Sequence, residues 1–273
     1  MRIVVDLQGA QTSVSRHRGV GRYSLGFAKS LARRAGPHEV WIALNATFPE
    51  TVETARAAFD GLVPQERLLV WQTPTPVADA TPGNRWRREI GECVREAFLA
   101  ELKPDLVHVS SLFEGFADDA VTSIGAFDRI LPTATTLYDL IPLLHRDRYL
   151  ADPAREAWYE RKLTHLRRAD LVLAISESSR SEGIACLNLP AERVVNVSAA
   201  ADPQFRPAAP TRDQQTALRR RYALSRPFVM YTGGIDQRKN VEGLIGAYAR
   251  LPDAVRGKHQ LAVVCAASRD ESA

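Results

Sequence analysis

Short apolar runs of strand length alternate along the chain with longer stretches in which apolar residues recur at helical spacing. Most of the short runs are apolar at nearly every position, which is typical of strands in a parallel sheet covered by helices on both faces. Predicted strands cover 2–7, 39–44, 67–71, 105–109, 133–137, 171–175 and 193–197, and predicted helices cover 21–34, 50–61, 84–102, 152–169 and 177–187. The alternation predicts a doubly wound, Rossmann-like α/β domain over residues 1–200.

This pattern stops at a proline-rich segment. Residues 201–210 contain three prolines and show no periodicity, so they are interpreted as an interdomain linker. A helix at 213–222, a strand at 228–232, a helix at 241–251 and a strand at 260–265 follow. Average sheets have about five or six strands, so residues 211–273 are interpreted as the beginning of a second Rossmann-like domain in a truncated chain. Its open strand edges predict disorder or self-association after about residue 210.

Composition and charge narrow the class of protein. The 273 residues are 45% hydrophobic and 25% charged, which is near the globular average. The net charge, 36 − 32 = +4, is too small to indicate nucleic acid but fits a protein that handles phosphates or contacts anionic lipid. Three distant cysteines, Cys93, Cys186 and Cys265, predict reduced thiols and no metal site. Without an apolar run of about 18 residues or a signal-peptide pattern, we expect a cytoplasmic protein.

The loop after the first predicted strand has the composition of an anion site. In open parallel sheets, ligands bind beyond the carboxyl ends of the strands. The loop contains SRHRGVGRY, in which Gly19 and Gly21 permit close backbone approach while Arg18 and Arg22 add positive charge. A flexible surface loop is the alternative interpretation. A dinucleotide fingerprint is disfavoured because Ser24 stands where the third glycine would be.

Three further strand ends carry polar candidates. Glu114 follows the strand at 105–109 and suits recognition of sugar hydroxyls, although a tight connection explains it equally well. Asp139 follows Tyr138 at the end of the strand at 133–137; it is our candidate catalytic residue, and a turn or capping role is the alternative. Ser176 begins the segment ISESSR, for which capping of the helix at 177–187 is favoured over contact with a ligand.

The sharpest pattern lies in the second predicted domain. A strand runs into Gly233 and Gly234, and Arg238 and Lys239 follow just before a helix. Cations at a helix N-terminus are unfavourable unless something negative compensates them. A guanidinium can bind phosphate oxygens through two hydrogen bonds, so the pattern predicts a diphosphate site. Two solvated cations are the alternative.

A basic cluster surrounds Trp86 at the start of the helix at 84–102. Arg85, Arg87 and Arg88 flank this tryptophan. An aromatic ring among arginines is consistent with peripheral contact at the inner face of a cell membrane, whereas a solvated helix end is the simpler interpretation. Both remain open.

Taken together, these segments resemble a known family. The loop SRHRGVGRYSL, the segments YDLIPL and ISESSR, the linker and above all YTGGIDQRKNVEGLI resemble retaining family-4 glycosyltransferases with the GT-B fold. The opening VDLQGAQT is similar to that of a bacterial subgroup that builds O-antigen or similar polysaccharides, including mannosyltransferases.

The resemblance implies a fold and a reaction. Two Rossmann-like domains would close over a GDP- or UDP-linked sugar, with a glycan or lipid-linked oligosaccharide acceptor mainly on the N-terminal domain. Arg238 and Lys239 match the family's pair that contacts the donor diphosphate, where their charge would take the place of a metal. Gly19 and Gly21 match its glycine loop beside the donor phosphate and the acceptor. The polar residues at the strand ends, Glu114, Tyr138, Arg18, Arg22 and Ser176, are the candidates for acceptor or sugar contact.

Two departures from the family limit this expectation. Tyr138 stands where many members have histidine, so a histidine contact to the donor sugar is missing. The family's Glu-x7-Glu motif would lie beyond residue 273, so little or no transferase activity is expected of this chain.

Two other functions are alternative hypotheses. One is a non-catalytic module that binds an acceptor or partner. The other is an NAD-dependent oxidoreductase, which is disfavoured because the dinucleotide fingerprint is missing.

Overall fold

A computed structural model describes residues 1–127, 131–202, 204–207 and 209–265 of the chain. The chain divides into two compact units, Met1–Asp202 and Pro203–Ala273. Each unit is described below by itself, since each forms its own sheet.

The first unit is built on a seven-stranded, all-parallel sheet with the order β3-β2-β1-β4-β5-β6-β7. Its strands are β1 (Arg2–Asp6), β2 (Glu39–Asn45), β3 (Leu68–Trp71), β4 (Leu106–Val109), β5 (Thr133–Leu137), β6 (Leu171–Ala174) and β7 (Val194–Asn196). The predicted α/β class, with a doubly wound parallel sheet, is confirmed. The strand order changes direction between β1 and β4, which makes this the topological switch point of the sheet.

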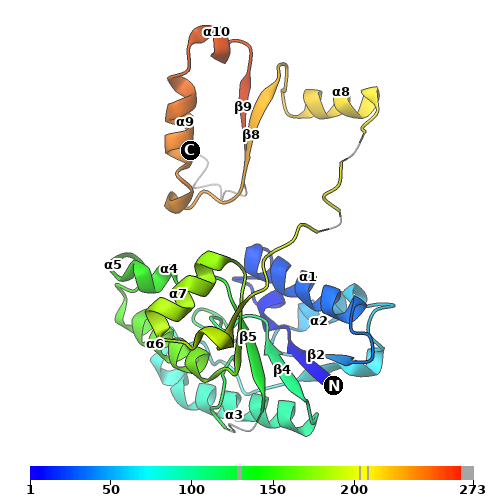
Figure 1. The fold of residues 1–273 in the computed structure, drawn as a ribbon, viewed down its shortest axis with the longest axis vertical. Helices are drawn as coiled ribbons and strands as arrows, with labels where there is room; N and C mark the ends of the chain where they lie inside the picture. Colours follow the sequence, from blue (N-terminus) through cyan, green and yellow to red (C-terminus); the bar gives the residue numbers. More distant parts are fainter. Residues whose placement is uncertain (128–130, 203, 208, 266–273) are drawn as a thin grey trace. The chain divides into compact units, whose positions relative to one another are not determined.

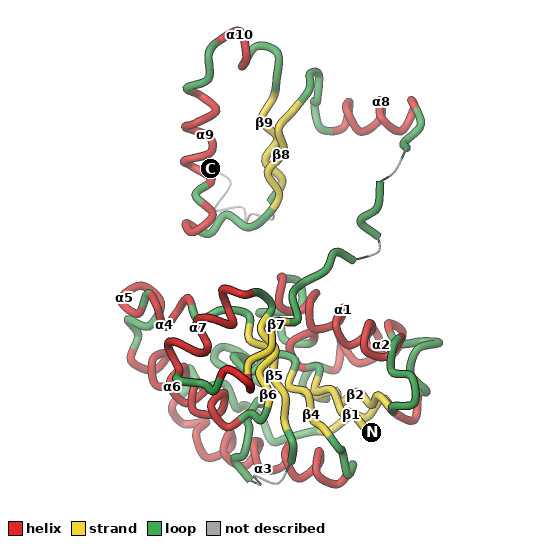
Figure 2. The backbone as a smooth tube through the Cα atoms, in the orientation of Figure 1, coloured by secondary structure: helices red, strands yellow, loops and turns green. Residues whose placement is uncertain are grey.

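Helices cover both faces of this sheet (Figures 1 and 2). They are α1 (Gly19–Arg33), α2 (Pro49–Ala58), α3 (Arg85–Glu101), α4 (Ile141–Leu144), α5 (Arg146–Tyr149), α6 (Pro153–Arg168) and α7 (Glu177–Leu187), with one-turn 3-10 helices η1 (Gln8–Ala10), η2 (Gln65–Arg67), η3 (Pro82–Asn84) and η4 (Ala191–Arg193). Successive strand residues point to opposite faces. Val5 accordingly packs with Phe59 after α2, whereas Val4 belongs to the cluster that contains Leu99 of α3 and Leu163 of α6.

Local sequence signals fix several of these boundaries. Asp152 caps α6 by accepting a hydrogen bond from the amide of Ala154 at 2.9 Å, and Pro153 occupies the first helical position. By contrast, α1 begins at Gly19, two residues before the predicted start. Gly19 and Gly21 therefore belong to the first turn of a helix rather than to the loop before it.

The second unit contains a two-stranded parallel sheet. Its elements are α8 (Arg212–Arg221), β8 (Phe228–Thr232), η5 (Gln237–Lys239), α9 (Val241–Ala249), α10 (Asp253–Arg256) and β9 (Gln260–Val264). None of the described residues of this unit is fully buried. Helices and strands nevertheless form within 209–265, so the disorder expected after about residue 210 is wrong for those residues, while self-association stays a prediction. Residues 266–273 lie outside the described part.

No helix in the described part of the chain is both long and apolar enough to cross a bilayer.

Candidate functional site

The carboxyl ends of four neighbouring strands bring the first-unit candidates to one edge of the sheet. The loop 7–18 leaves β1, the segment 110–116 leaves β4, Tyr138 and Asp139 follow β5, and Ser176 comes two residues after β6. Since β1 and β4 flank the switch point, the loops after these two strands border the crevice in which this class of sheet binds ligands.

The start of α1 is packed against the preceding loop at Gly21. A Cβ atom on Gly21 would lie 2.5 Å from both the Cα of Arg16 and the carbonyl oxygen of Ser15. The Gly21 amide donates to that same carbonyl at 3.1 Å. Gly19, two residues earlier, has open space around its Cα. Gly21 is thus required by close packing of the loop on the helix.

The same turn carries positive charge. Arg18 is the N-cap residue of α1 and offers the helix no side-chain hydrogen bond. Arg18 and Arg22 are exposed, and among the described residues neither forms an ion pair. The amide dipoles at a helix N-terminus favour an anion. The structure therefore presents two available guanidinium groups at the positive end of a 15-residue helix.

These observations predict that a glycine-to-alanine change affects the free energy of unfolding differently at Gly21 and at Gly19. We expect Gly21→Ala to lower the free energy of unfolding by about 1–3 kcal/mol, because the added methyl group must displace backbone. Gly19→Ala is the matched control, with an expected change within about 1 kcal/mol and of stabilising sign. Urea unfolding of both variants measures the difference; equal stability would contradict the packing argument.

Glu114 lies inside the protein at this edge. Its Oε1 accepts hydrogen bonds from the hydroxyls of Ser15 at 2.7 Å and Ser111 at 2.8 Å, and its Oε2 accepts one from Thr12 at 3.2 Å. Burial raises the pKa of the carboxyl group to about 7, with only partial compensation from these hydroxyls. The hydroxyl groups that Glu114 binds in this structure thus belong to the chain's own side chains. Contact of Glu114 with a sugar stays a prediction.

Tyr138 joins β5 to the start of α1. Its hydroxyl lies 3.0 Å from the Ser24 hydroxyl and donates to the carbonyl of Ser110 at 3.0 Å. Its ring packs edge-on against that of Tyr23, with centroids 5.5 Å apart. Burial raises the pKa of this phenol, so Tyr138 stays protonated at neutral pH. Since its polar atom is already bonded within the chain, its expected sugar contact also stays a prediction.

The other two candidates have local roles. Asp139 is exposed, and its Oδ1 accepts a hydrogen bond from the amide of Ile141 at 3.1 Å, which is the turn role considered as the alternative. Its catalytic role stays a prediction. Ser176 caps α7 by accepting from the amide of Ser179 at 3.1 Å, so the favoured capping interpretation is confirmed.

The sequence did not single out the buried ion pair at the end of β1. Asp6 and Arg95 are each 1% exposed, and the Arg95 Nη2 lies 2.5 Å from the Asp6 Oδ2. The Gln8 side chain donates to the same carboxylate at 3.0 Å and to the carbonyl of Val121 at 2.6 Å. Asp6 stands at the end of an apolar run, the position at which the other candidates were found, and that signal could have identified it.

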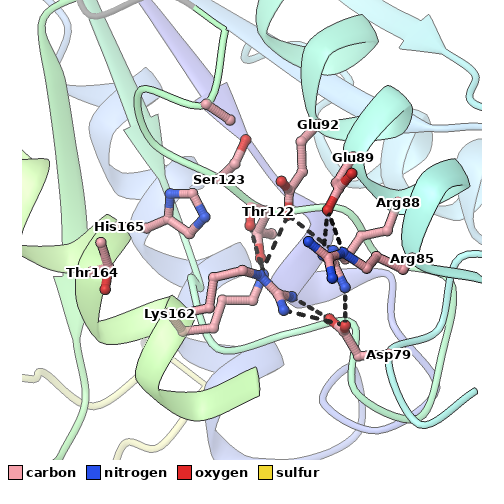
Figure 3. A network of polar contacts seen from close by, with 12 residues as sticks. Asp79, Arg85, Arg88, Glu89, Glu92, Thr122, Ser123, Lys162, Thr164 and His165 are labelled. Carbon is pink, nitrogen blue, oxygen red and sulfur yellow. Dashed lines mark hydrogen bonds and ion pairs between the residues drawn. The ribbon is translucent and has the colours of Figure 1, made fainter. Parts of the chain in front are cut away.

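A second charged network lies between α3 and α6 (Figure 3). The Asp79 carboxylate is bound by Arg88 of α3 and Arg161 of α6. The ammonium group of Lys162 donates to the carbonyl and hydroxyl oxygens of Thr122 at 2.6 and 2.7 Å. Burial lowers the pKa of Lys162 to about 7. Through Asp79, this network links α3 to α6.

In the second unit the structure corrects one step of the charge argument. Arg238 and Lys239 lie in η5, whereas α9 begins at Val241 with Asn240 as its cap. Arg238 pairs with Asp236, whose Oδ1 is 3.1 Å from the Arg238 Nε. A bound anion is therefore not needed to compensate Arg238. Lys239 is exposed and forms no ion pair among the described residues.

The two glycines of this loop lie beside Tyr231. Gly233 has φ +156°, and a Cβ atom on it would lie 2.9 Å from the Tyr231 hydroxyl. That hydroxyl donates to the carbonyl of Gly234 at 2.6 Å. The structure thus places Gly233, Gly234, Arg238 and Lys239 in the loop from β8 to α9 of the second unit. Across the described ranges, no group of three His, Cys, Asp or Glu side chains is placed to hold a metal ion.

Both a family model and individual relatives match this chain. The model of the family "Glycosyltransferase Family 4" matches residues 17–205. The serotype-specific mannosyltransferase WbdA of Escherichia coli is 32% identical over 262 residues, which are 96% of this chain and 31% of that protein. The O-antigen chain mannosyltransferase B of Escherichia coli is 26% identical, over 89% of this chain and 59% of its own. This chain thus spans less than two thirds of either relative.

Solved structures show the same fold. The Anabaena Alr3699/HepE structure, a complex with UDP and glucose, matches with a TM-score of 0.57 at 15% identity, over 99% of this chain and 62% of that one. The lipopolysaccharide outer core galactosyltransferase WaaB in its apo form matches with a TM-score of 0.51 at 14% identity, over 96% and 60%.

Proposed function

Since the chain belongs to glycosyltransferase family 4, we propose that the protein transfers a hexose from a nucleotide sugar to a glycan or lipid-linked acceptor. By analogy with its relatives, this hexose would be mannose. The relatives that match nearly all of the chain are named mannosyltransferases, one of them for the O-antigen chain. This supports a role in the synthesis of cell-surface polysaccharide.

One observation carries the proposal. The residues selected from the sequence as phosphate and sugar contacts converge on the loops that follow parallel strands, which are the ligand-binding edges of such sheets. In the first unit the exposed Arg18 and Arg22 stand at the N-terminus of α1. In the second unit Arg238 and Lys239 follow Gly233 and Gly234.

The proposed chemistry is stabilisation of a leaving nucleoside diphosphate. A guanidinium and an ammonium group placed at the developing negative charge can supply this without a metal ion. Arg238 and Lys239 would bind the diphosphate, which would displace Asp236 from Arg238. The acceptor would lie at the β1–β4 switch point, with Asp139 nearby as the candidate catalytic side chain. Retention of configuration rests on the family resemblance.

Direct binding tests the proposal. In isothermal titration of the full-length protein we expect a GDP- or UDP-linked hexose to bind with a micromolar dissociation constant or tighter, and NAD not to bind. UDP accompanies glucose in the Anabaena structure, so UDP-linked hexoses belong in the panel beside GDP-linked ones. The absence of binding by every nucleotide sugar would overturn the proposal and favour a non-catalytic module.

We also propose that α3 contacts an anionic membrane surface, where a lipid-linked acceptor would be found. The inward face of α3 is charged, with Glu92, Arg95 and Glu96 all buried. Its outward face carries an apolar stripe, in which Trp86, Ile90 and Val94 are exposed by 56%, 43% and 37% at every fourth position, beside the exposed Arg85–Glu89 ion pair. Beside Trp86 stand two cations, Arg85 and Arg87, the latter lying over the indole ring at 5.1 Å. A tryptophan and cations beside an apolar stripe suit the headgroup region of a bilayer.

Vesicle binding tests this contact. We expect the triple change of Arg85, Trp86 and Arg87 to alanine to reduce binding to phosphatidylglycerol vesicles about thirtyfold, since the two lost cations each contribute about 1 kcal/mol near anionic lipid. Phe127→Ala, which removes another exposed aromatic ring, is the control and should leave binding unchanged. Equal binding to neutral phosphatidylcholine vesicles would contradict the role of charge.

A further inference from the structure

Glu114 connects the two loops that border the switch point. It belongs to the segment after β4, yet two of its three hydrogen bonds come from Thr12 and Ser15 in the loop after β1. The side chain is 4% exposed, so these bonds are made out of water. Burying a carboxylate is costly unless hydrogen bonds compensate it, and an uncharged residue would fill this space at lower cost. The placement therefore needs a reason beyond packing.

The backbone on both sides holds Glu114 in this position. Gly115, the next residue, has φ +88°, and a Cβ atom there would lie 2.2 Å from the carbonyl oxygen of Ala120. Ser15, its hydrogen-bond donor, also accepts from the Gly21 amide through its carbonyl at 3.1 Å. A chain of contacts thus runs from Glu114 through Ser15 to the first turn of α1, where Arg18 and Arg22 stand.

We propose that Glu114 is a positioning residue that holds the loop 11–18, and through Ser15 the first turn of α1, in the arrangement in which Arg18 and Arg22 receive a phosphate of the donor. The ligand in this statement rests on the proposed function; the positioning of the loop does not. Glu114 acts through Ser15 and Thr12, and it need not touch the ligand itself.

Protonation of Glu114 controls the strength of this connection. We call the loop 11–18 closed when Thr12 and Ser15 are hydrogen-bonded to Glu114, as in this structure. In the closed loop the ionised form of Glu114 is disfavoured, because burial raises its pKa to about 7 from 4.5. The groups that act on it electrostatically are Asp118 on its own segment and Tyr138 after β5. Asp118 also has a pKa raised by burial. A raised carboxyl pKa stabilises the closed loop at low pH, and this stabilisation is lost as pH rises from about 4.5 through about 7.

Hydrogen exchange of the amides of residues 12–22 tests the proposal without any ligand. We expect the equilibrium for opening of the loop, corrected for intrinsic exchange, to increase on the order of tenfold between pH 5.5 and 8.5 in the wild type. Glu114→Gln should keep the loop protected and abolish this pH dependence, since the amide oxygen still accepts from Ser15 and Ser111. Glu114→Ala should lose protection at every pH.

Ser15→Ala and Ser111→Ala form a matched pair. Both remove one hydroxyl from the same carboxylate oxygen, at 2.7 and 2.8 Å, but only Ser15 lies on the loop. We expect loss of protection in Ser15→Ala and near wild-type protection in Ser111→Ala. Equal exchange in the two variants, or unchanged loop protection in Glu114→Ala, would overturn the proposal. If Glu114→Ala does not fold, the serine pair and the pH profile of Glu114→Gln decide.

The ligand part is tested separately. With a nucleotide sugar that the wild type binds, Ser15→Ala should weaken affinity about tenfold and Ser111→Ala should not. If the wild type binds no nucleotide sugar, the proposed function fails while the exchange result stands. If exchange shows the connection but affinity is equal in both serine variants, the loop is held by Glu114 without serving the ligand, and this part is overturned.

Discussion

Arg95→Ala is expected to lower the free energy of unfolding of the first unit by about 3–5 kcal/mol. The guanidinium of Arg95 lies within 2.5 Å of the Asp6 carboxylate and also donates to the carbonyl of Ser123 at 3.0 Å. Asp6 and Arg95 are each 1% exposed, so the truncation leaves a carboxylate without its partner and out of reach of water. Urea unfolding followed by circular dichroism measures the loss.

Arg85→Ala is the control for this measurement, because it makes the same change on the same helix. The side chain of Arg85 is 78% exposed and pairs with Glu89 at 2.9 Å, and exposed pairs of this kind contribute about 0.5 kcal/mol. Adding Asp6→Asn to Arg95→Ala should recover part of the stability by removing the stranded charge. A loss in Arg95→Ala no larger than in Arg85→Ala would show that the buried pair contributes little.

Helix α3 shows where sequence reasoning stops. Its existence and ends were predictable, since the predicted 84–102 corresponds to Arg85–Glu101. Which of its faces is buried was not predictable, because the usual rule places apolar residues inside. Here Arg95 and Glu96 point inward, since Asp6 of β1 and the amides of Ala126 and Phe127 offer them partners. Those partners are distant in sequence and meet α3 only in the folded chain.

Strand positions were predicted better because they depend on short apolar runs alone. The apolar run at 228–232 coincides with β8, and Ser176 was identified as a capping residue from its residue type and its place just before the helix at 177–187. The site was predicted as a set of strand ends, which the parallel topology brings together. The partners of Glu114 were not predictable, because Thr12 and Ser15 approach it only after β1 and β4 pair.

A simultaneous change of Arg238 and Lys239 to alanine is expected to weaken binding of a nucleoside diphosphate to the full-length protein about 100-fold. Hydrogen bonds to charged groups contribute about 1.5–3 kcal/mol each, and part of the Arg238 contribution is offset because a diphosphate must displace Asp236, which lies 3.1 Å away. Titration with GDP and UDP measures the loss, and turnover should fall with it.

Arg250→Ala with Lys258→Ala is the matched control, since it removes the same two residue types from exposed positions of the same unit, so that both double variants have the same net charge. Affinity that falls equally in both double variants would mean that only overall positive charge attracts the nucleotide, and unchanged affinity in the Arg238 and Lys239 variant would place the diphosphate elsewhere.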